Sequence, residues 1–298
     1  MQICDLQVNI SGHLLRTARL DAEKYHFASD PEAMVDGLRH TGERVDLFTF
    51  VQPVSEREPK HEYPMEWDNF AVLPVSTFEN WWEKQLGFKA RNKAKQAEKK
   101  GIELREVPFD QSLARGIWEI YNECPIRQGR RFAHYGKDVD TVYREAATYL
   151  STSTFIGAYL GQELIGFIKL VADPQGRQAG LMNIISKIQH RDKAPTNALV
   201  AHAVRACARR GIPHLVYSNY AYANKERDSV ADFKERNGFL RYDVPRYYVP
   251  LTPLGASALR LGFHHRLVDR FPEAWASRIR ELRRNWYARK FGNLSEAS

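Results

Sequence analysis

The feature that most constrains the fold is a series of three apolar runs in the second half of the chain. Residues 154–160, 163–172 and 178–188 are rich in aliphatic side chains. Gly161-Gln162 separates the first two runs, and Asp173-Pro174-Gln175-Gly176 separates the last two. Turn residues at these places between strand-forming runs predict a meander of three consecutive strands.

Further helices and strands are predicted on both sides of this meander. Before it we expect a strand, a helix, a polar loop and a second helix, at 102–107, 113–123, 124–137 and 138–150. After it we expect a helix, a strand, a short helix and aromatic strands, at 195–210, 214–219, 229–236 and 239–250. This order predicts an α/β (α+β) domain at 101–250, with a mixed central sheet flanked by helices.

Residues 1–76 are predicted to form a smaller, strand-rich region. Runs at 14–20, 45–51 and 70–75 favour strands. Since about 75 residues are few for an independent α/β domain, we expect this region to pack on the next one.

At 77–100 the pattern predicts one basic helix that connects the two regions. Ser76 and Glu79 have the spacing of a capping box, and Gly101 can end the helix in the left-handed conformation. A single apolar seam is formed by Phe78, Trp82, Leu86, Ala90, Ala94 and Ala97. Lysines and arginines surround its alanine end, so this face is either solvated or binds an anion.

The positive charge is concentrated in two segments. The chain has a formal net charge of +8, and residues 89–105 carry seven Lys/Arg against two Glu. Residues 260–290 carry nine Lys/Arg against three acids, so the rest of the chain is slightly acidic. An anionic partner is therefore expected to meet one of these two segments.

Other features point to a soluble, cytoplasmic protein. No apolar run approaches the roughly 20 residues of a membrane-spanning helix, and residues 1–5 do not resemble a secretory signal. Cys4, Cys124 and Cys207 are far apart and lack metal-ligand spacing. We expect reduced thiols and no metal, with a nucleophilic Cys124 as the alternative.

The order of elements at 101–250 resembles the GNAT acyltransferase fold, and three segments resemble its FemAB branch. They are the basic helix Lys89–Ile102, the helix start Pro195–Leu199 and the segment Asp232–Phe239. The resemblance covers about half of the chain. It implies transfer of an acyl or aminoacyl group to an amine, from acyl-CoA or aminoacyl-tRNA.

One loop departs from the GNAT pattern. Acetyl-CoA-binding members use Gln/Arg-x-x-Gly-x-Gly/Ala, whose bare backbone N–H groups reach the pyrophosphate. Here residues 189–196 contain no glycine, and Pro195 lacks an N–H. Coenzyme A in the usual pose is therefore not expected, although Arg191, Lys193 and Asn197 remain candidates for binding the acyl donor.

Lys234 stands where many GNAT enzymes have a tyrosine four residues before a Gly-Phe pair. By resemblance to the FemAB relatives, Lys234 would lie in the cleft and stabilise the oxyanion that forms when an amine attacks a carbonyl carbon. The alternative is a surface lysine beside Phe233.

The remaining candidates divide between donor and acceptor. Asn183 and Ser186 lie on the central strand, where GNAT folds splay two strands, and are predicted to bind the donor. The polar loop supplies Arg127, Arg130, Arg131 and Tyr135, which with Tyr220 are predicted to bind an anionic acceptor. His134 is the candidate general base. Ordinary structural roles are the alternative for each.

The last predicted element is a basic helical tail at 251–298. Trp275, Ile279, Leu282 and Trp286 form an apolar face among arginines, so residues 275–290 either bind an anionic membrane surface or dock on the domain.

Three functions remain open. The first is an N-acyltransferase acting on a small-molecule or cell-envelope precursor. The second is a non-catalytic RNA-binding module, with tRNA as partner. The third is a peripheral protein held by its tail at the inner face of the membrane.

Overall fold

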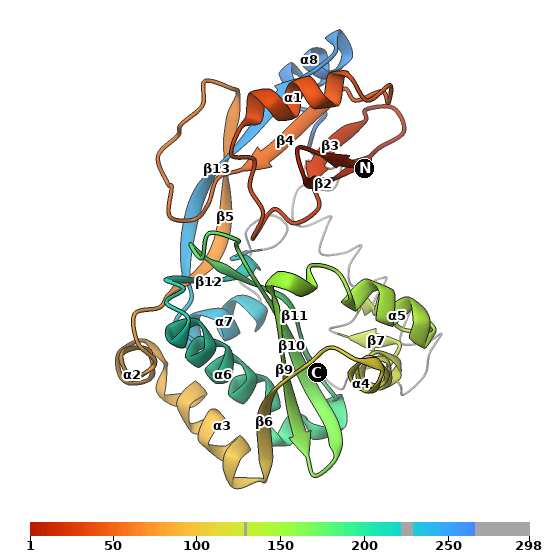
Figure 1. Cartoon of the computed structure of the whole chain (residues 1–298). Helices are drawn as coiled ribbons and strands as arrows, with labels where there is room; N and C mark the ends of the chain where they lie inside the picture. Colours follow the sequence, from red (N-terminus) through yellow and green to blue (C-terminus); the bar gives the residue numbers. More distant parts are fainter. Residues whose placement is uncertain (128–129, 222–228, 266–298) are drawn as a thin grey trace.

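The computed structural model describes residues 1–127, 130–221 and 229–265. In this part of the chain the central element is an eleven-stranded sheet (Figure 1). Its order is β1 (Gln2–Ile3), β2 (Leu6–Ser11), β3 (Thr17–Leu20), β4 (Leu47–Val51), β13 (Leu240–Pro250), β5 (Met65–Pro74), β12 (His214–Asn219), β11 (Ala179–Ser186), β10 (Glu163–Ala172), β9 (Ser153–Leu160) and β6 (Ile102–Val107). Neighbouring strands are antiparallel except the pairs β3–β4 and β11–β12.

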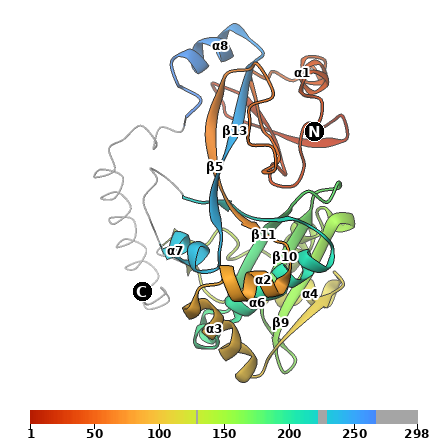
Figure 2. The ribbon, with the colours of Figure 1, turned by 90° about the vertical axis from the view of Figure 1, so that its left-hand side faces the viewer.

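Two long strands connect the halves of the molecule. β5 and β13 pair with each other from Leu240 opposite Val72 to Tyr247 opposite Met65. β4 pairs with the end of β13, and β12 pairs with the end of β5. Figures 1 and 2 show both strands running from the half that holds β1–β4 to the half that holds β6 and β9–β12.

Helices cover both faces of the second half. They are α2 (Phe78–Asn80), the π-helix η1 (Trp81–Gln85), α3 (Phe88–Lys99), α4 (Gln111–Asn122), α5 (Val139–Ala146), α6 (Pro195–Arg209) and α7 (Ser229–Arg236). Leu199 and Val204 of α6 pack with Ile156 on one face. Ile117 of α4 packs with Phe155 on the other. Since residues 155 and 156 are neighbours in β9, their side chains point to opposite faces.

Short elements complete the fold. They are the hairpin of β7 (Ile126–Arg127) and β8 (Arg130–Arg131), the 3₁₀ turns η2 (Leu150–Thr152) and η3 (Ile188–Lys193), and the helices α1 (Pro31–Arg39) and α8 (Pro253–Arg260). No helix in the described part of the chain is long and apolar enough to cross a membrane. The predicted tail segment 275–290 lies outside the described residues.

The predicted meander is confirmed as β9, β10 and β11, and the mixed sheet flanked by helices is also confirmed. The single helix at 77–100 is wrong. Thr77, not Ser76, caps the first turn by accepting a hydrogen bond from Asn80 N at 3.0 Å. The helix then breaks at Leu86 and Gly87, which have extended ψ angles of 121° and 144°. Gly87 N instead donates to the carbonyl of Arg236 at 2.9 Å.

The N-terminal region also contains a helix, α1, that the sequence analysis did not predict. Asp30 accepts a hydrogen bond from Ala33 N at 2.9 Å, and Pro31 occupies the first turn. Met34, Val35 and Leu38 are buried. An Asp-Pro pair before apolar residues at this spacing is a helix signal, so this helix can be predicted from the sequence.

Candidate functional site

The site lies where β11 and β12 diverge. These parallel strands pair only through Ala179–Leu215 and Gly180–Val216. Beyond these pairs a cleft of about 640 Å³ opens, lined by Ile184, Ile185 and Ser186 of β11 and by Tyr217 of β12. This is the splay between strands that the GNAT resemblance implies.

The start of α6 forms one wall of the cleft. Ala194, the residue before the helix, has φ 55° and offers no side-chain cap, and Pro195 begins the first turn. Thr196 and Asn197 also line the cleft, and Thr196 Oγ1 lies 3.0 Å from Ser186 Oγ. The positive end of the helix dipole is therefore directed at the cleft.

The cleft is strongly basic. No carboxylate occurs among the described residues that line it, whereas seven cations do: Lys89, Lys93, Arg127, Arg131, Lys187, Arg191 and Arg236. Arg127, Lys187 and Arg236 form ion pairs with Glu123, Glu163 and Asp232. The other four form none with any carboxylate of the described residues, so their charge is available to an anionic ligand.

Glu123 occupies backbone donors of the loop before α6. Its carboxylate accepts hydrogen bonds from Ile188 N at 2.7 Å and Gln189 N at 3.0 Å. It also accepts one from Arg127 Nη2 at 2.9 Å. Part of the backbone that binds pyrophosphate in the GNAT pattern therefore already holds an anionic group of the protein itself.

Lys234 is fully buried, so the alternative of a surface lysine is wrong. Its Nζ donates a hydrogen bond to the carbonyl of Asn219, at the end of β12. The same Nζ lies 4.9 Å from the centre of the Tyr217 ring, which lines the cleft. Phe233 of α7 and Asn237, the residue after α7, line the cleft as well. The ammonium group is thus held just behind the cleft wall.

A second chamber of about 270 Å³ adjoins the cleft, since Phe132, Ile184, Ile185 and Tyr217 line both. His134 and Asn183 lie in this chamber. The His134 ring stacks on Tyr121 with centroids 4.4 Å apart. Burial, and then the charge of Lys137, lower the pKa of His134. The lowered pKa favours the neutral imidazole, the form that can accept a proton.

The other predicted residues are divided between the cleft and the surface. Arg127, Arg131, Arg191, Ser186 and Asn197 line the first chamber. Arg130 and Tyr135 are exposed and do not line either chamber. Lys193 does not line them either, and its Nζ lies 3.4 Å from Asp192 Oδ1. Tyr220 packs against the core. Of the described residues predicted for the site, these four and Lys234, which lies behind the cleft wall, line neither chamber.

Lys24 is a site residue that the sequence analysis missed. Its Nζ donates a hydrogen bond to Ser218 Oγ at 2.9 Å in the second chamber. Burial lowers the pKa of Lys24, against the opposing charges of Glu23 and Asp68. Ser218 has φ 52°, a conformation uncommon for a residue with a side chain. Nothing in the local sequence shows that a residue 194 positions away reaches this strand.

Comparison with known proteins supports the fold assignment. No family model and no curated relative matches the chain. Among solved structures, FemX is similar with a TM-score of 0.59 and 10% identity over 86% of each chain. The L-PGS of Bacillus licheniformis has a TM-score of 0.56 and 11% identity over 91% of this chain and 88% of its own.

A third similar structure is the C-terminal domain of a putative lysylphosphatidylglycerol synthetase from Agrobacterium fabrum. It has a TM-score of 0.55 and 12% identity over 88% of this chain and 87% of its own. At 10–12% sequence identity, the structural similarity establishes the fold alone. The chain therefore has a FemAB-like GNAT fold, shared with FemX, the L-PGS structure and the Agrobacterium fabrum domain.

Proposed function

We propose that this chain is an N-acyltransferase that moves an aminoacyl group from a charged tRNA to an amine of an anionic acceptor. The observation that carries the proposal is the basic cleft between β11 and β12, in a fold shared with FemX and with a domain of a putative lysylphosphatidylglycerol synthetase. Four of the lysines and arginines that line the cleft form no ion pair with a carboxylate of the described residues. Their positive charge suits both a nucleic-acid backbone and an anionic acceptor.

The loop before α6 favours aminoacyl-tRNA over acyl-CoA as donor. Glu123 fills the N–H groups of Ile188 and Gln189, and Pro195 has none to offer. A diphosphate placed there would lie against a carboxylate and meet electrostatic repulsion. Acyl-CoA is therefore expected to be a poor donor.

The reaction needs a group that stabilises negative charge and a route for one proton. The acceptor amine attacks the carbonyl carbon of the aminoacyl ester, a C–N bond forms, and the C–O bond to the tRNA 3′ oxygen breaks. The proton that the amine loses goes to that leaving oxygen, with neutral His134 as a candidate carrier. Lys234 stabilises the oxyanion of the tetrahedral intermediate from behind Tyr217.

The test uses the full chain with bulk tRNA charged with ¹⁴C-labelled amino acids and a panel of phosphorylated and carboxylated amines. We expect radiolabel to appear in an amide, which resists mild alkali, while the ester of the donor does not. A parallel reaction with ¹⁴C-acetyl-CoA should give little product. Binding of tRNA without any transfer would favour the RNA-binding module instead.

Lys234→Met tests the assigned role with a matched control. It removes the charge at similar length, and we expect the transfer rate to fall at least about 100-fold. Lys169→Met is the control, because Lys169 is also fully buried but its Nζ donates to Ala146 and Thr148, away from the cleft. Equal loss of activity in the two variants, both folded by circular dichroism, would remove Lys234 from the mechanism.

A further inference from the structure

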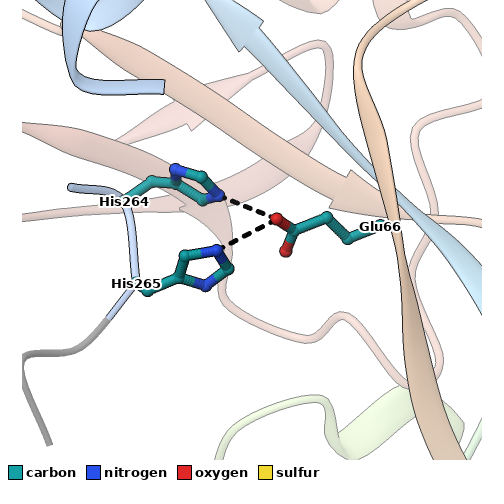
Figure 3. Close-up of side chains that lie close together, drawn as sticks. All are labelled: Glu66, His264 and His265. Atoms are coloured by element: carbon teal, nitrogen blue, oxygen red, sulfur yellow. Dashed lines mark hydrogen bonds and ion pairs between the residues drawn. The ribbon is translucent and has the colours of Figure 1, made fainter. Parts of the chain in front are cut away.

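A cluster outside the basic cleft brings one carboxylate and two imidazoles together (Figure 3). Glu66 Oε1 lies 3.1 Å from His264 Nε2 and 3.0 Å from His265 Nε2. One ligand atom from each residue lies within 4.8 Å of the others. Figure 3 shows both rings directed at the same carboxylate oxygen.

Several contacts fix this arrangement. Glu66 belongs to the long strand β5 and lies opposite Arg246 of β13. The two histidines follow α8 in a turn held by Phe263 N, which donates to the Ala258 carbonyl at 2.7 Å. Tyr248 Oη donates to the second oxygen of Glu66 at 3.3 Å, and its ring contacts His264 edge-on with centroids 4.7 Å apart. The carboxylate is thus oriented from behind, as ligands of metal sites commonly are.

The donor set is that of a transition-metal site. Zinc binds imidazole nitrogen and carboxylate oxygen at about 2.0–2.2 Å. Two ligand atoms around a tetrahedral ion then lie about 3.3 Å apart, close to the separations from Glu66 to the two histidines. Imidazole selects zinc, nickel, cobalt or copper over magnesium and calcium, which prefer oxygen ligands alone.

An ion pair without metal is the competing explanation. Within the described residues, Glu66 forms no ion pair with a lysine or arginine. The described residues therefore place no lysine or arginine against the Glu66 carboxylate, and a bound cation would balance its charge. His264 is nearly buried, with 5% of its side chain exposed.

We propose that Glu66, His264 and His265 bind one zinc ion or a similar divalent transition metal, with a fourth position open to water. The ion connects the turn after α8 to β5. The cysteine spacing predicts no metal site, and local sequence does not reveal this cluster, because Glu66 lies 198 positions from His264. This proposal is independent of the transfer reaction.

The test is calorimetric titration of the metal-stripped full chain, free of any affinity tag, with ZnCl₂. We expect one ion per chain, a thermal midpoint that rises with zinc, visible absorption bands with Co²⁺, and no binding of Mg²⁺. His265→Ala should weaken zinc binding at least about 100-fold, and Tyr248→Phe about tenfold. His265 is 42% exposed, so its truncation should leave the fold intact.

The control is His13→Ala, an exposed histidine of the N-terminal region, which should bind zinc as the unaltered chain does. Glu66→Gln keeps the shape of the side chain and should weaken binding while leaving the fold in place. Absence of stoichiometric zinc binding, or equal affinity in the His265→Ala and His13→Ala variants, would overturn the proposal.

Discussion

Lys169 and Lys234 are both fully buried, yet their ammonium groups have different surroundings. Lys234 lies against Tyr217 at the cleft wall. Lys169 points from β10 to the end of α5, where its Nζ lies 2.9 Å from the Ala146 carbonyl and 3.0 Å from Thr148 Oγ1. It satisfies carbonyl groups at a helix end, as lysines near C-termini do. Burial alone therefore does not identify a site lysine in this chain.

The environment of Lys169 leads to a pH dependence of stability. Burial lowers its pKa from 10.5 to about 8 in the folded chain. The unfolded chain binds the proton of the Lys169 ammonium more tightly than the folded chain does. Below pH 8 the charged lysine therefore lowers the free energy of unfolding, and this loss of stability disappears as the pH rises towards 10.5. The free energy of unfolding of the unaltered chain relative to Lys169→Met should increase over this range, by up to about 3 kcal/mol.

Urea denaturation at pH values between about 7.5 and 9.5, on either side of the lowered pKa, measures this difference. Lys95→Met serves as control, because Lys95 is exposed on α3. A difference between the chain and Lys169→Met that stays constant with pH would contradict the lowered pKa.

At the scale of elements, α3 presents two sets of lysines. Ala90, Ala94 and Ala97 are buried on the side that packs against α6. Lys89 and Lys93, one turn apart, line the cleft, whereas Lys95 and Lys99 do not. The two open possibilities for this helix, a solvated face and an anion-binding face, thus describe different sides of it.

This division predicts which lysines bind RNA. Lys89→Gln with Lys93→Gln should weaken tRNA binding and reduce the slope of log affinity against log salt by about 0.7 for each lysine–phosphate interaction that the substitutions remove. Lys95→Gln with Lys99→Gln removes the same charge from the outer side and should change the affinity far less. Fluorescence anisotropy over a range of about 50–200 mM salt tests both. Equal reductions in the two variants would indicate a diffuse charge effect rather than a site.

The elements show what local sequence can predict. The meander and α6 follow from residues that are close in sequence, since turns and apolar periodicity specify them. The break in the helix at Gly87 does not follow from nearby residues, because Gly87 N donates its hydrogen bond to the carbonyl of the distant Arg236. Likewise Lys24 and Glu123 enter the site only through the tertiary fold, whereas Arg127 and Ser186 could be predicted from a family pattern.

At the scale of the whole molecule, an ionic network joins the halves. Arg246 of β13 donates to both oxygens of Glu23 at 2.9 Å and to Asp68 Oδ2 at 2.9–3.0 Å. Asp68 also accepts a hydrogen bond from Asn219 Nδ2 at 2.8 Å, and the Asn219 carbonyl accepts one from Lys234. The N-terminal region is therefore connected by hydrogen bonds and ion pairs to the lysine behind the cleft.

Because β5 and β13 belong to both halves, we expect the described fold to unfold as one cooperative unit. Neither half can release these strands without exposing the core of the other. Calorimetry should give one transition whose calorimetric and van't Hoff enthalpies agree.

Arg246→Met should lower the free energy of unfolding by about 3–5 kcal/mol, since it leaves Glu23 and Asp68 largely buried without their partner, and should keep the single transition. Arg241→Met, on the same strand but 42% exposed, removes only a surface pair with Asp243 and should cost at most about 1 kcal/mol. Two separate transitions would show that the halves are stable independently of the shared strands. Equal costs for the two substitutions would show that Arg246 contributes no more to stability than a surface ion pair does.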